Sequence, residues 1–339
     1  MTELKNKIVE GDCIEVLQKV EEPFADLVFA DPPYNIGYKY DKYHDKKKKQ
    51  DYHEWTEQWM TQCYRVLKPH GSFYVAIGDE HAADVKVIAD RLKLVMRNWI
   101  IWHYSFGQQS PNKFARAHAH IFYFVKDKKN FVFNDDLVRV LSDRQKKYND
   151  KRANPDGKMP DDVWNEYPRV CGTFRERTGF PCQMPESLLA RIIRTSSNEG
   201  DWVLDPFCGS GTTATVAYKL RRLYTTIDMS AEYVEAARGR IREATGLPVE
   251  GNGSPRWPEH ADLELKWLYS ENRTPVAQLC EHRLLLSLVT RKLNGRLRKN
   301  EPYTPEEVRE RLYELDRTAK LSPLDKMSAI QPGDSAFEE

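Results

Sequence analysis

Short apolar segments of strand length alternate with amphipathic helical segments along the first 125 residues. Residues 25–30 (ADLVFA) are almost wholly apolar, which is typical of a strand in a parallel sheet covered by helices. This strand must end at Asp31-Pro32-Pro33, because proline cannot donate a ladder hydrogen bond. The alternation predicts a doubly wound, mostly parallel α/β sheet. We expect strands at 7–9, 25–30, 72–77, 99–104 and 120–125, and helices at 14–20, 52–67 and 82–94.

The composition of the chain changes at residue 126. From 126 to 180 the sequence is polar and interrupted by proline and glycine, so we expect an irregular segment. Regular structure is expected again from 186, with helices at 186–195, 212–220 and 230–244 and strands at 202–204 and 224–227. The chain should therefore comprise a domain over 1–245 that contains the segment 126–180, a glycine- and proline-rich linker over 246–260, and a helical extension over 261–339 with an N-cap at Thr304.

Composition excludes several classes of protein. No run of 18 apolar residues occurs, and the N-terminal residues lack the apolar core of a signal peptide, so we expect a cytoplasmic protein without a membrane partner. The six cysteines are scattered without a CxxC pair, which argues against a disulfide framework and a structural zinc site. The 52 Lys and Arg against 51 Asp and Glu give a net charge of +1, so contact with nucleic acid must depend on local patches.

A glycine-rich turn follows the expected strand at 202–204 and opens the next helix, with the sequence LDPFCGSGTT over 204–213. Glycines let the backbone approach a ligand closely, and the N-terminus of the helix offers free N–H groups to an anion. A GxG turn alone is a weak signal, but Asp228 ends the following strand at a spacing that suits a carboxylate on ribose hydroxyls. The ligand indicated is a nucleoside.

A second motif, Asp31-Pro32-Pro33-Tyr34, ends the strand at 25–30. A plain turn would account for these residue types. However, a carboxylate, rigid carbonyls and an aromatic face at the carboxyl edge of a sheet can also hold a planar base that bears an amino group. The carboxylate or a carbonyl would accept the amino hydrogens, and the tyrosine would stack on the base.

These two motifs together resemble those of the DNA amino-methyltransferases, which transfer a methyl group from S-adenosylmethionine to the exocyclic amine of adenine or cytosine. The tetrapeptide DPPY at 31–34 precedes the FxGxG motif at 207–211, and this order is similar to the permuted, beta-type branch with its Rossmann-like fold. Residues 11–13 and the PxQKPE-like segment 181–186, with Met184 in place of lysine, match in the same order. The resemblance implies catalytic roles for Asp31, Pro32, Pro33 and Tyr34, and cofactor binding by Asp12, Cys13, Asp31, Gln183, Asp205, Phe207, Gly209, Gly211, Thr212 and Asp228.

The resemblance further implies methylation of adenine N6 in double-stranded DNA after the base has been flipped out, with S-adenosylhomocysteine as product. Adenine is preferred because cytosine-N4 enzymes more often carry SPPY. A cytosine-N4 enzyme, a non-catalytic DNA-binding paralogue and an RNA or protein-amide methyltransferase are the alternatives; intact motifs and the motif order favour the DNA enzyme. A homodimer and a cognate restriction endonuclease remain open as partners.

Contacts with DNA are expected in three places. The segment 126–180 falls where the family keeps its target-recognition region. The lysines at 46–49, after DPPY, are either a solvated charge run or part of a loop that closes over DNA or cofactor. Residues 291–299 carry five positive charges without an acid, which is either a solvated helix end or a set of phosphate contacts. The expected DNA-binding residues are Lys46, Lys47, Arg169, Arg175, Arg177, Arg296 and Arg298.

Two other chemistries are disfavoured. The triplet at 181–183 resembles the nucleophile motif of cytosine-5 methyltransferases, but the order of motifs is reversed and no ENV triplet follows, so Cys182 is interpreted as a packed residue. His103, His118 and His120 lack a familiar ligand spacing joined to a third ligand, so no metal site is expected.

Overall fold

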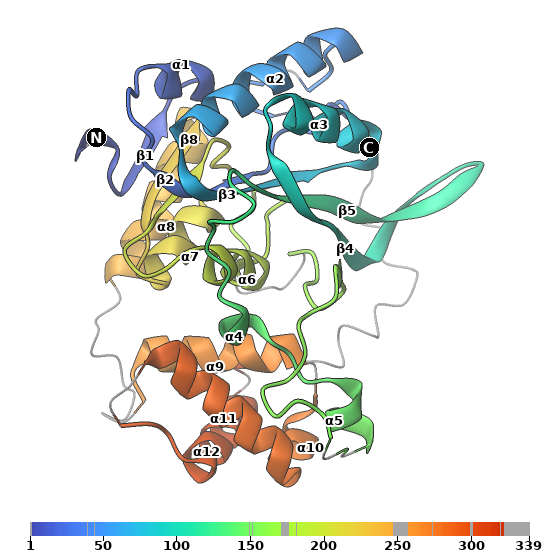
Figure 1. Ribbon diagram of the computed structural model, residues 1–339, viewed down its shortest axis with the longest axis vertical. Helices are drawn as coiled ribbons and strands as arrows, with labels where there is room; N and C mark the ends of the chain where they lie inside the picture. The colour runs from blue at the N-terminus through green and yellow to red at the C-terminus, as the bar shows by residue number, and fades with distance from the viewer. Residues whose placement is uncertain are drawn as a thin grey trace. The chain divides into compact units, whose positions relative to one another are not determined.

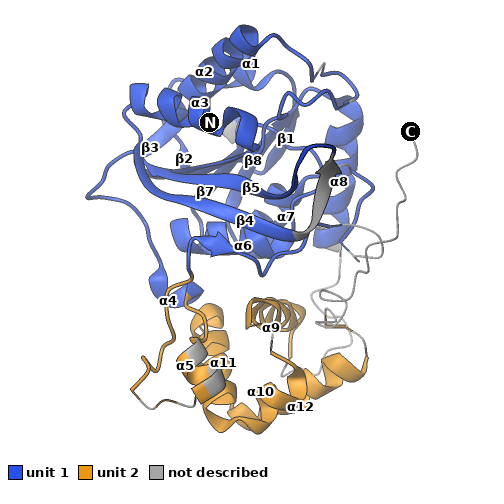
Figure 2. Ribbon diagram, turned by 90° about the vertical axis from the view of Figure 1, so that its right-hand side faces the viewer, with its two compact units in different colours: residues 1–138, 161–249 blue, residues 139–160, 250–339 orange. Residues whose placement is uncertain are grey.

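The structure, a computed structural model, describes residues 2–38, 40–43, 45–148, 150, 152–170, 176–180, 182–246, 257–272, 274–298, 301–318 and 320–321. The chain divides into two compact units (Figure 2). The first comprises Met1–Val138 and Asp161–Val249, and the second comprises Arg139–Pro160 and Glu250–Glu339.

An eight-stranded sheet forms the centre of the first unit, in the order β1-β8-β7-β2-β3-β5-β4-β6. The strands are β1 (Lys7–Glu10), β2 (Ala25–Ala30), β3 (Leu67–Ile77), β4 (Val95–Ser110), β5 (Lys113–Val125), β6 (Val163–Trp164), β7 (Trp202–Asp205) and β8 (Leu223–Asp228). All pairs from β1 to β3 are parallel, β5 is antiparallel to β3 and β4, and β6 is parallel to β4. The predicted doubly wound, mostly parallel sheet is therefore confirmed.

Helices cover both faces of this sheet (Figure 1). On one face lie α1 (Cys13–Gln18), α2 (Lys49–Val66) and α3 (Asp79–Arg91), and on the other lie α6 (Glu186–Ser196), α7 (Thr212–Lys219) and α8 (Ala231–Gly246). The core beneath α2 is aromatic. Trp59 is fully buried, with its ring 6.3 Å from that of Phe73 in β3 and 5.1 Å from that of Phe207 in the turn after β7. Burial of each such side chain stabilises the fold by about 1.5–3 kcal/mol.

Three strands are longer than the sequence pattern predicts. The hairpin of β4 and β5 extends beyond the expected 99–104 and 120–125, because residues 113–118 of β5 mix basic with small and aromatic residues and lie outside the core, so they form no continuous apolar run. β3 begins at Leu67, before the expected break at 68–71, and its pairing with β2 is irregular there. Lys68 and His70 of this irregular stretch both bind the buried carboxylate of Asp26, at 2.9 and 2.8 Å.

The second unit is helical. It contains α5 (Asp143–Tyr148), α9 (Glu259–Asn272), α10 (Val276–Glu281), α11 (Arg283–Leu297) and α12 (Pro305–Arg317), which confirms the expected helical extension. Thr304 caps α12 as predicted, in a capping box with Glu307. The expected linker lies mostly outside the described residues, which resume at 257.

The segment 126–180 is divided between the units. Its middle part, Arg139–Pro160, belongs to the second unit, whereas the short helix α4 (Asp135–Val138) and β6 belong to the first. Leu141 packs on Leu285 and Leu288 of α11, and Asp156 forms an ion pair of 2.7 Å with Arg291. Buried apolar contact with α11 therefore places this part of the segment with the helices. No helix among the described residues is long and apolar enough to cross a bilayer.

Candidate active site

The two sequence motifs end neighbouring strands. β2 pairs with β7 in parallel, Leu27 with Val203 and Val28 with Leu204, so their carboxyl ends lie at the same edge of the sheet. Ligands of open α/β sheets bind outside the carboxyl ends of the strands, at the topological switch point where the strand order reverses. A cavity of about 250 Å³ opens there. Of the predicted residues, it is lined by Asp12, Cys13, Asp31, Pro32, Pro33, Tyr34, Arg169, Gln183, Asp205, Phe207, Gly209, Thr212 and Asp228.

Asp31 and Tyr34 form the polar contact at the end of β2. The hydroxyl of Tyr34 donates a hydrogen bond of 2.9 Å to Oδ1 of Asp31. Burial raises the pKa of Asp31 to about 7, although the bond from Tyr34 acts in the opposite direction. The ring of Tyr34 packs on Gly78, where an added Cβ would lie 3.2 Å from it. The hydroxyl of Tyr52 donates to the carbonyl of Pro33 at 2.7 Å and fixes the tetrapeptide from α2.

The segment after the tetrapeptide is held by a buried carboxylate that the sequence analysis did not identify. Asp45 is 1% exposed, and its two oxygens accept hydrogen bonds from the N–H groups of Asn35, Ile36 and Tyr38 at 2.7, 3.1 and 3.0 Å. Asn35, at a φ of 59°, also exchanges two hydrogen bonds with the backbone of Lys47. These contacts hold the part of the segment that carries tyrosines against the cavity.

The lysines of this segment differ in their surroundings. The ammonium of Lys47 lies 5.3 Å from the ring centre of Tyr43, whereas Lys46 is exposed. Neither side chain lines the cavity, so a contact with DNA would be made at its margin.

Carboxylates surround the other half of the cavity. Asp228, at the end of β8, accepts from the N–H groups of Gly209 and Ser230 at 2.8 and 3.0 Å. Asp205, at the end of β7, accepts from the N–H of Phe207 at 2.9 Å and from the hydroxyl of Thr213 at 2.5 Å. Burial raises the pKa of Asp205 to about 8 and also raises the pKa of Asp228. A bound positive charge would therefore stabilise both carboxylates in their ionised form.

The two glycines of the FxGxG motif have different surroundings. Gly209 lines the cavity at a φ of 48°, and a Cβ there would lie 2.8 Å from the ring of Phe180. Gly211 does not line the cavity. It adopts a φ of 73° at the N-terminus of α7, and a Cβ there would lie 2.7 Å from that of Ala237 in α8. Gly211 therefore permits the close packing of α7 on α8, and its binding of the cofactor stays a prediction.

Three further predicted cofactor residues are engaged in the protein's own contacts. Asp12 caps α1 by accepting from the N–H of Ile14 at 2.7 Å, and Cys13 is buried in the first turn of that helix. The hydroxyl of Thr212 is held by the guanidinium of Arg240 at 2.9 Å.

The wall formed by 180–184 carries Gln183 and Cys182. The amide oxygen of Gln183 accepts from the N–H and hydroxyl of Thr178 at 2.9 and 3.0 Å, and its nitrogen donates to the carbonyl of Glu176 at 2.6 Å. Gln183 thus fixes the conformation of the cavity wall through hydrogen bonds to residues 176 and 178. Cys182 is exposed, so its interpretation as a packed residue is wrong. Desolvation nevertheless raises the pKa of its thiol, which disfavours a thiolate nucleophile, while Pro181 lies outside the described residues.

Basic residues near the cavity include one that the sequence analysis missed. Arg169 lies over the ring of Tyr104, 5.1 Å from its centre, and lines the cavity. Arg116 lines it as well and pairs with Asp79 at 3.1 Å. It was missed because it lies in the polar half of β5. Arg177 is exposed but does not line the cavity, and Arg175 lies outside the described residues.

The expected phosphate contact of Arg296 is wrong. Its side chain is 2% exposed and forms ion pairs with Glu271 at 2.6 Å and Glu264 at 3.6 Å, within the second unit. A guanidinium enclosed by two carboxylates cannot reach a phosphate. Arg298, by contrast, is exposed at the end of α11.

Comparison with known proteins agrees with this geometry. The profile of a family described as DNA methylase matches residues 25–239. The chain is 36% identical over 239 residues to the Type II methyltransferase M.HpaI of Haemophilus parainfluenzae, covering 70% of this chain and 74% of that protein. It is 36% identical over 251 residues to the DNA adenine methyltransferase YhdJ of Escherichia coli (strain K12), covering 72% and 85%. Among solved structures, PvuII DNA methyltransferase (cytosine-N4-specific) shares the fold, with a TM-score of 0.56, 20% identity and coverage of 78% and 93%.

Proposed function

The chain belongs to the DNA methylase family, and we propose that it transfers a methyl group from S-adenosylmethionine to N6 of adenine in double-stranded DNA. The observation that carries the proposal is the common cavity of the tetrapeptide 31–34 and the glycine-rich turn after β7. The choice of adenine is supported by the aspartate in DPPY and by the similarity to YhdJ, which is named a DNA adenine methyltransferase.

The residues around the glycine-rich turn fit S-adenosylmethionine. Asp205 and Asp228 are carboxylates whose burial favours a cationic ligand, and the backbone of Gly209 lines the cavity beside them. We assign the ribose hydroxyls to Asp228, which lies at the end of the strand next to the turn. When bound, the cofactor supplies a methyl group already activated by its sulfonium, so the protein needs only to present the acceptor amine.

Asp31, Pro32 and Tyr34 would present that amine. The lone pair of the adenine amino group is delocalised into the ring, which makes the nitrogen a poor nucleophile. Hydrogen bonds from its two N–H groups to Asp31 and to the carbonyl of Pro32 favour the pyramidal geometry from which it attacks. Tyr34 stacks on the base, a contact of about 1–3 kcal/mol. After transfer, the excess proton can pass to Asp31, because burial holds the pKa of this carboxyl at about 7.

The target base must leave the helix to reach this cavity. A base inside a duplex is stacked and paired, so enzymes that modify it flip it into a pocket. We assign target recognition to the segment 126–180, with Arg169 and Arg177 as candidate readers of the bases beside the flipped one. Arg116, which lines the cavity, joins them. A homodimer and a cognate restriction endonuclease are the partners that this function would admit.

The base specificity is tested by labelling. Purified protein is incubated with plasmid DNA and S-adenosylmethionine that carries a labelled methyl group, and the DNA is digested to nucleosides and separated by chromatography. We expect the label in N6-methyl-2′-deoxyadenosine and its absence with Asp31→Ala, which should still bind S-adenosylmethionine. Label in N4-methyl-2′-deoxycytidine would contradict the assignment of the base, and equal labelling by Asp31→Ala would contradict the role of Asp31.

A further inference from the structure

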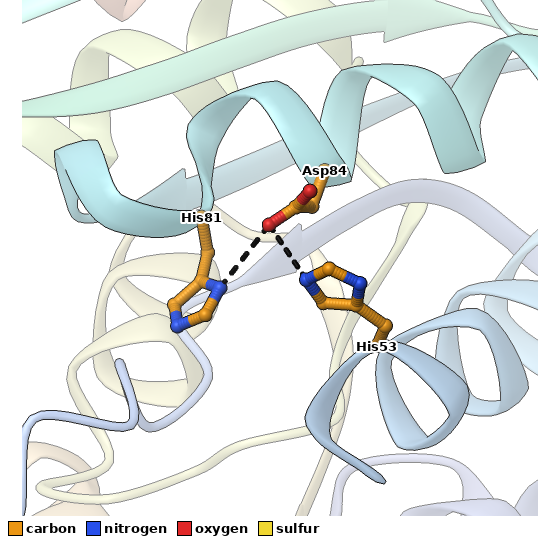
Figure 3. Close-up of side chains that lie close together, drawn as sticks. All are labelled: His53, His81 and Asp84. Atoms are coloured by element: carbon orange, nitrogen blue, oxygen red, sulfur yellow. Dashed lines mark hydrogen bonds and ion pairs between the residues drawn. The ribbon is translucent and has the colours of Figure 1, made fainter. Parts of the chain in front are cut away.

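Two histidines and one aspartate from neighbouring helices converge at a place that the methyl transfer does not use (Figure 3). His53 lies in α2, and His81 and Asp84 lie one turn apart in α3. One carboxylate oxygen of Asp84, Oδ2, is 2.7 Å from Nε2 of His53 and 3.3 Å from Nδ1 of His81. The three donor atoms lie within 4.8 Å of one another. We propose that these three side chains form a binding site for a zinc ion.

The kinds of donor atom select the metal. Two imidazole nitrogens and one carboxylate oxygen are a common zinc donor set with three protein ligands, in which water occupies the fourth position. Magnesium and calcium prefer sites made entirely of oxygen, so nitrogen donors disfavour them. The site is of the open type, since the side chains of His53 and Asp84 are 26% and 25% exposed.

The distances require little adjustment. In a tetrahedral zinc site with bonds of about 2.0–2.1 Å, two donor atoms are separated by about 3.3 Å. The separation of His81 and Asp84 already equals this value at 3.3 Å. The contact of His53 with Asp84, at 2.7 Å, would have to widen by about 0.6 Å. The two imidazole nitrogens, which lie within 4.8 Å of one another, would have to reach the same separation, and rotation of the partly exposed His53 side chain contributes to both changes.

The position of His81 is fixed by packing. Its side chain is only 7% exposed, and its ring lies 4.3 Å from that of Tyr52, centre to centre. Tyr52 is the residue whose hydroxyl donates to the carbonyl of Pro33 in the catalytic tetrapeptide. An ion held at this site would therefore join α2 to α3 directly behind the residue that holds the tetrapeptide.

A network of hydrogen bonds without a metal is the competing explanation. Asp84 would then accept one hydrogen bond from each imidazole, and the cluster would serve only to hold the two helices together. Zinc binding instead requires the lone pairs of these same nitrogens, so the ion displaces both protons. The two explanations therefore differ in whether the protein takes up zinc.

The test is a zinc titration of the full-length protein after treatment with a chelator, in competition with a chromophoric chelator and without DNA or S-adenosylmethionine. We expect one zinc ion per chain and a higher melting temperature with zinc, and no uptake of magnesium. His53→Gln and Asp84→Asn should each weaken zinc binding by at least about tenfold. Circular dichroism checks that each variant is folded, and the two variants lie on different helices.

Two matched controls should leave zinc binding unchanged. His70→Gln alters another histidine that contacts a carboxylate, that of Asp26 at 2.8 Å. The second partner of Asp26 is Lys68 and not a histidine, so this cluster should not bind zinc. Cys182→Ser removes a thiol near the cavity. X-ray absorption at the zinc edge should report nitrogen and oxygen ligands alone. The proposal would be overturned if the protein did not bind zinc, if both cluster variants bound zinc with the affinity of the original protein, or if a sulfur ligand were found. None of these results bears on the methylation of adenine.

Discussion

Replacement of Asp45 by asparagine should uncouple methyl transfer from cofactor binding. The carboxylate accepts one hydrogen bond at Oδ1, from Asn35, and two at Oδ2, from Ile36 and Tyr38. An asparagine can keep the first bond through its carbonyl, but its NH₂ group then faces two N–H donors. Each lost bond to a charged acceptor is worth about 1.5–3 kcal/mol. Loss of the two bonds at Oδ2 therefore destabilises the folded conformation of the segment after the tetrapeptide by about 3–6 kcal/mol.

This segment adjoins Tyr34 and supplies tyrosines to the cavity, whereas Asp205 and Asp228, the carboxylates that bind the glycine-rich turn, belong to β7 and β8. We therefore expect kcat/KM for methyl transfer to fall by at least about a hundredfold, the rate equivalent of about 3 kcal/mol. The affinity for S-adenosylmethionine, measured by calorimetry, should change by less than about threefold, since no bond to the turn is lost.

The control is Asp41→Asn, a change in the same segment. Asp41 is exposed and accepts a single side-chain bond, from the hydroxyl of Ser230 at 2.7 Å. This variant should keep kcat/KM within about tenfold of the original, because loss of one exposed bond costs about 0.5–1.5 kcal/mol. Full activity of Asp45→Asn would refute the reasoning, and so would an equal loss in both variants.

Three further predictions concern residues of the cavity and of the second unit. Burial raises the pKa of Asp31 to about 7, and the ionised carboxylate is the better acceptor of amine hydrogens. We therefore expect kcat/KM to rise with pH through about 7. The residual activity of Asp31→Asn should lack this rise. Gly211→Ala and Gly209→Ala should both lower the melting temperature, because each glycine has a positive φ and a close neighbour, Ala237 and Phe180 respectively. Only Gly209 lines the cavity, so Gly209→Ala should weaken S-adenosylmethionine binding more in calorimetry; the reverse order would contradict the assignment. Arg296→Ala should destabilise the second unit in thermal unfolding by about 3–5 kcal/mol, because it removes a buried guanidinium that forms ion pairs with two buried carboxylates. Arg298→Ala should leave unfolding unchanged and lower the salt slope of DNA binding by about 0.9 if it contacts a phosphate; an unchanged slope means a solvated helix end.

The motifs at strand ends could be predicted because their residues interrupt a local pattern. Proline stops β2 at Asp31, and glycine separates β7 from α7, so the carboxyl ends of both strands could be located from the sequence. The pairing of parallel strands then brings these ends together without further information. The fold of the first unit and the main walls of the cavity follow from this reasoning.

Contacts between residues distant in sequence could not be predicted in the same way. Asp45 lies beside lysines, and nothing in its neighbours indicates that its carboxylate is buried under three N–H groups. A run of positive charges does not reveal that the guanidinium of Arg296 faces carboxylates of α9. Leu141 belongs to a short apolar pair with Val140 inside a polar segment, and nothing in that pair indicates that it packs on α11, so the segment 126–180 could not be divided from composition.

The pairing of β1 with β8 has a consequence for synthesis on the ribosome. Lys7 of β1 pairs with Thr225 of β8, and β2 has β7 as one of its two neighbours. The first strands of the nascent chain therefore cannot complete their pairing until the last strands of the sheet have been synthesised. Until residues 202–228 have emerged, β2 exposes one unpaired apolar edge, which is a template for association with other chains. Long-range closure of this kind is slow. A truncated product that ends before β7 should therefore aggregate, and cofactor binding should arise only after the chain has been released through β8.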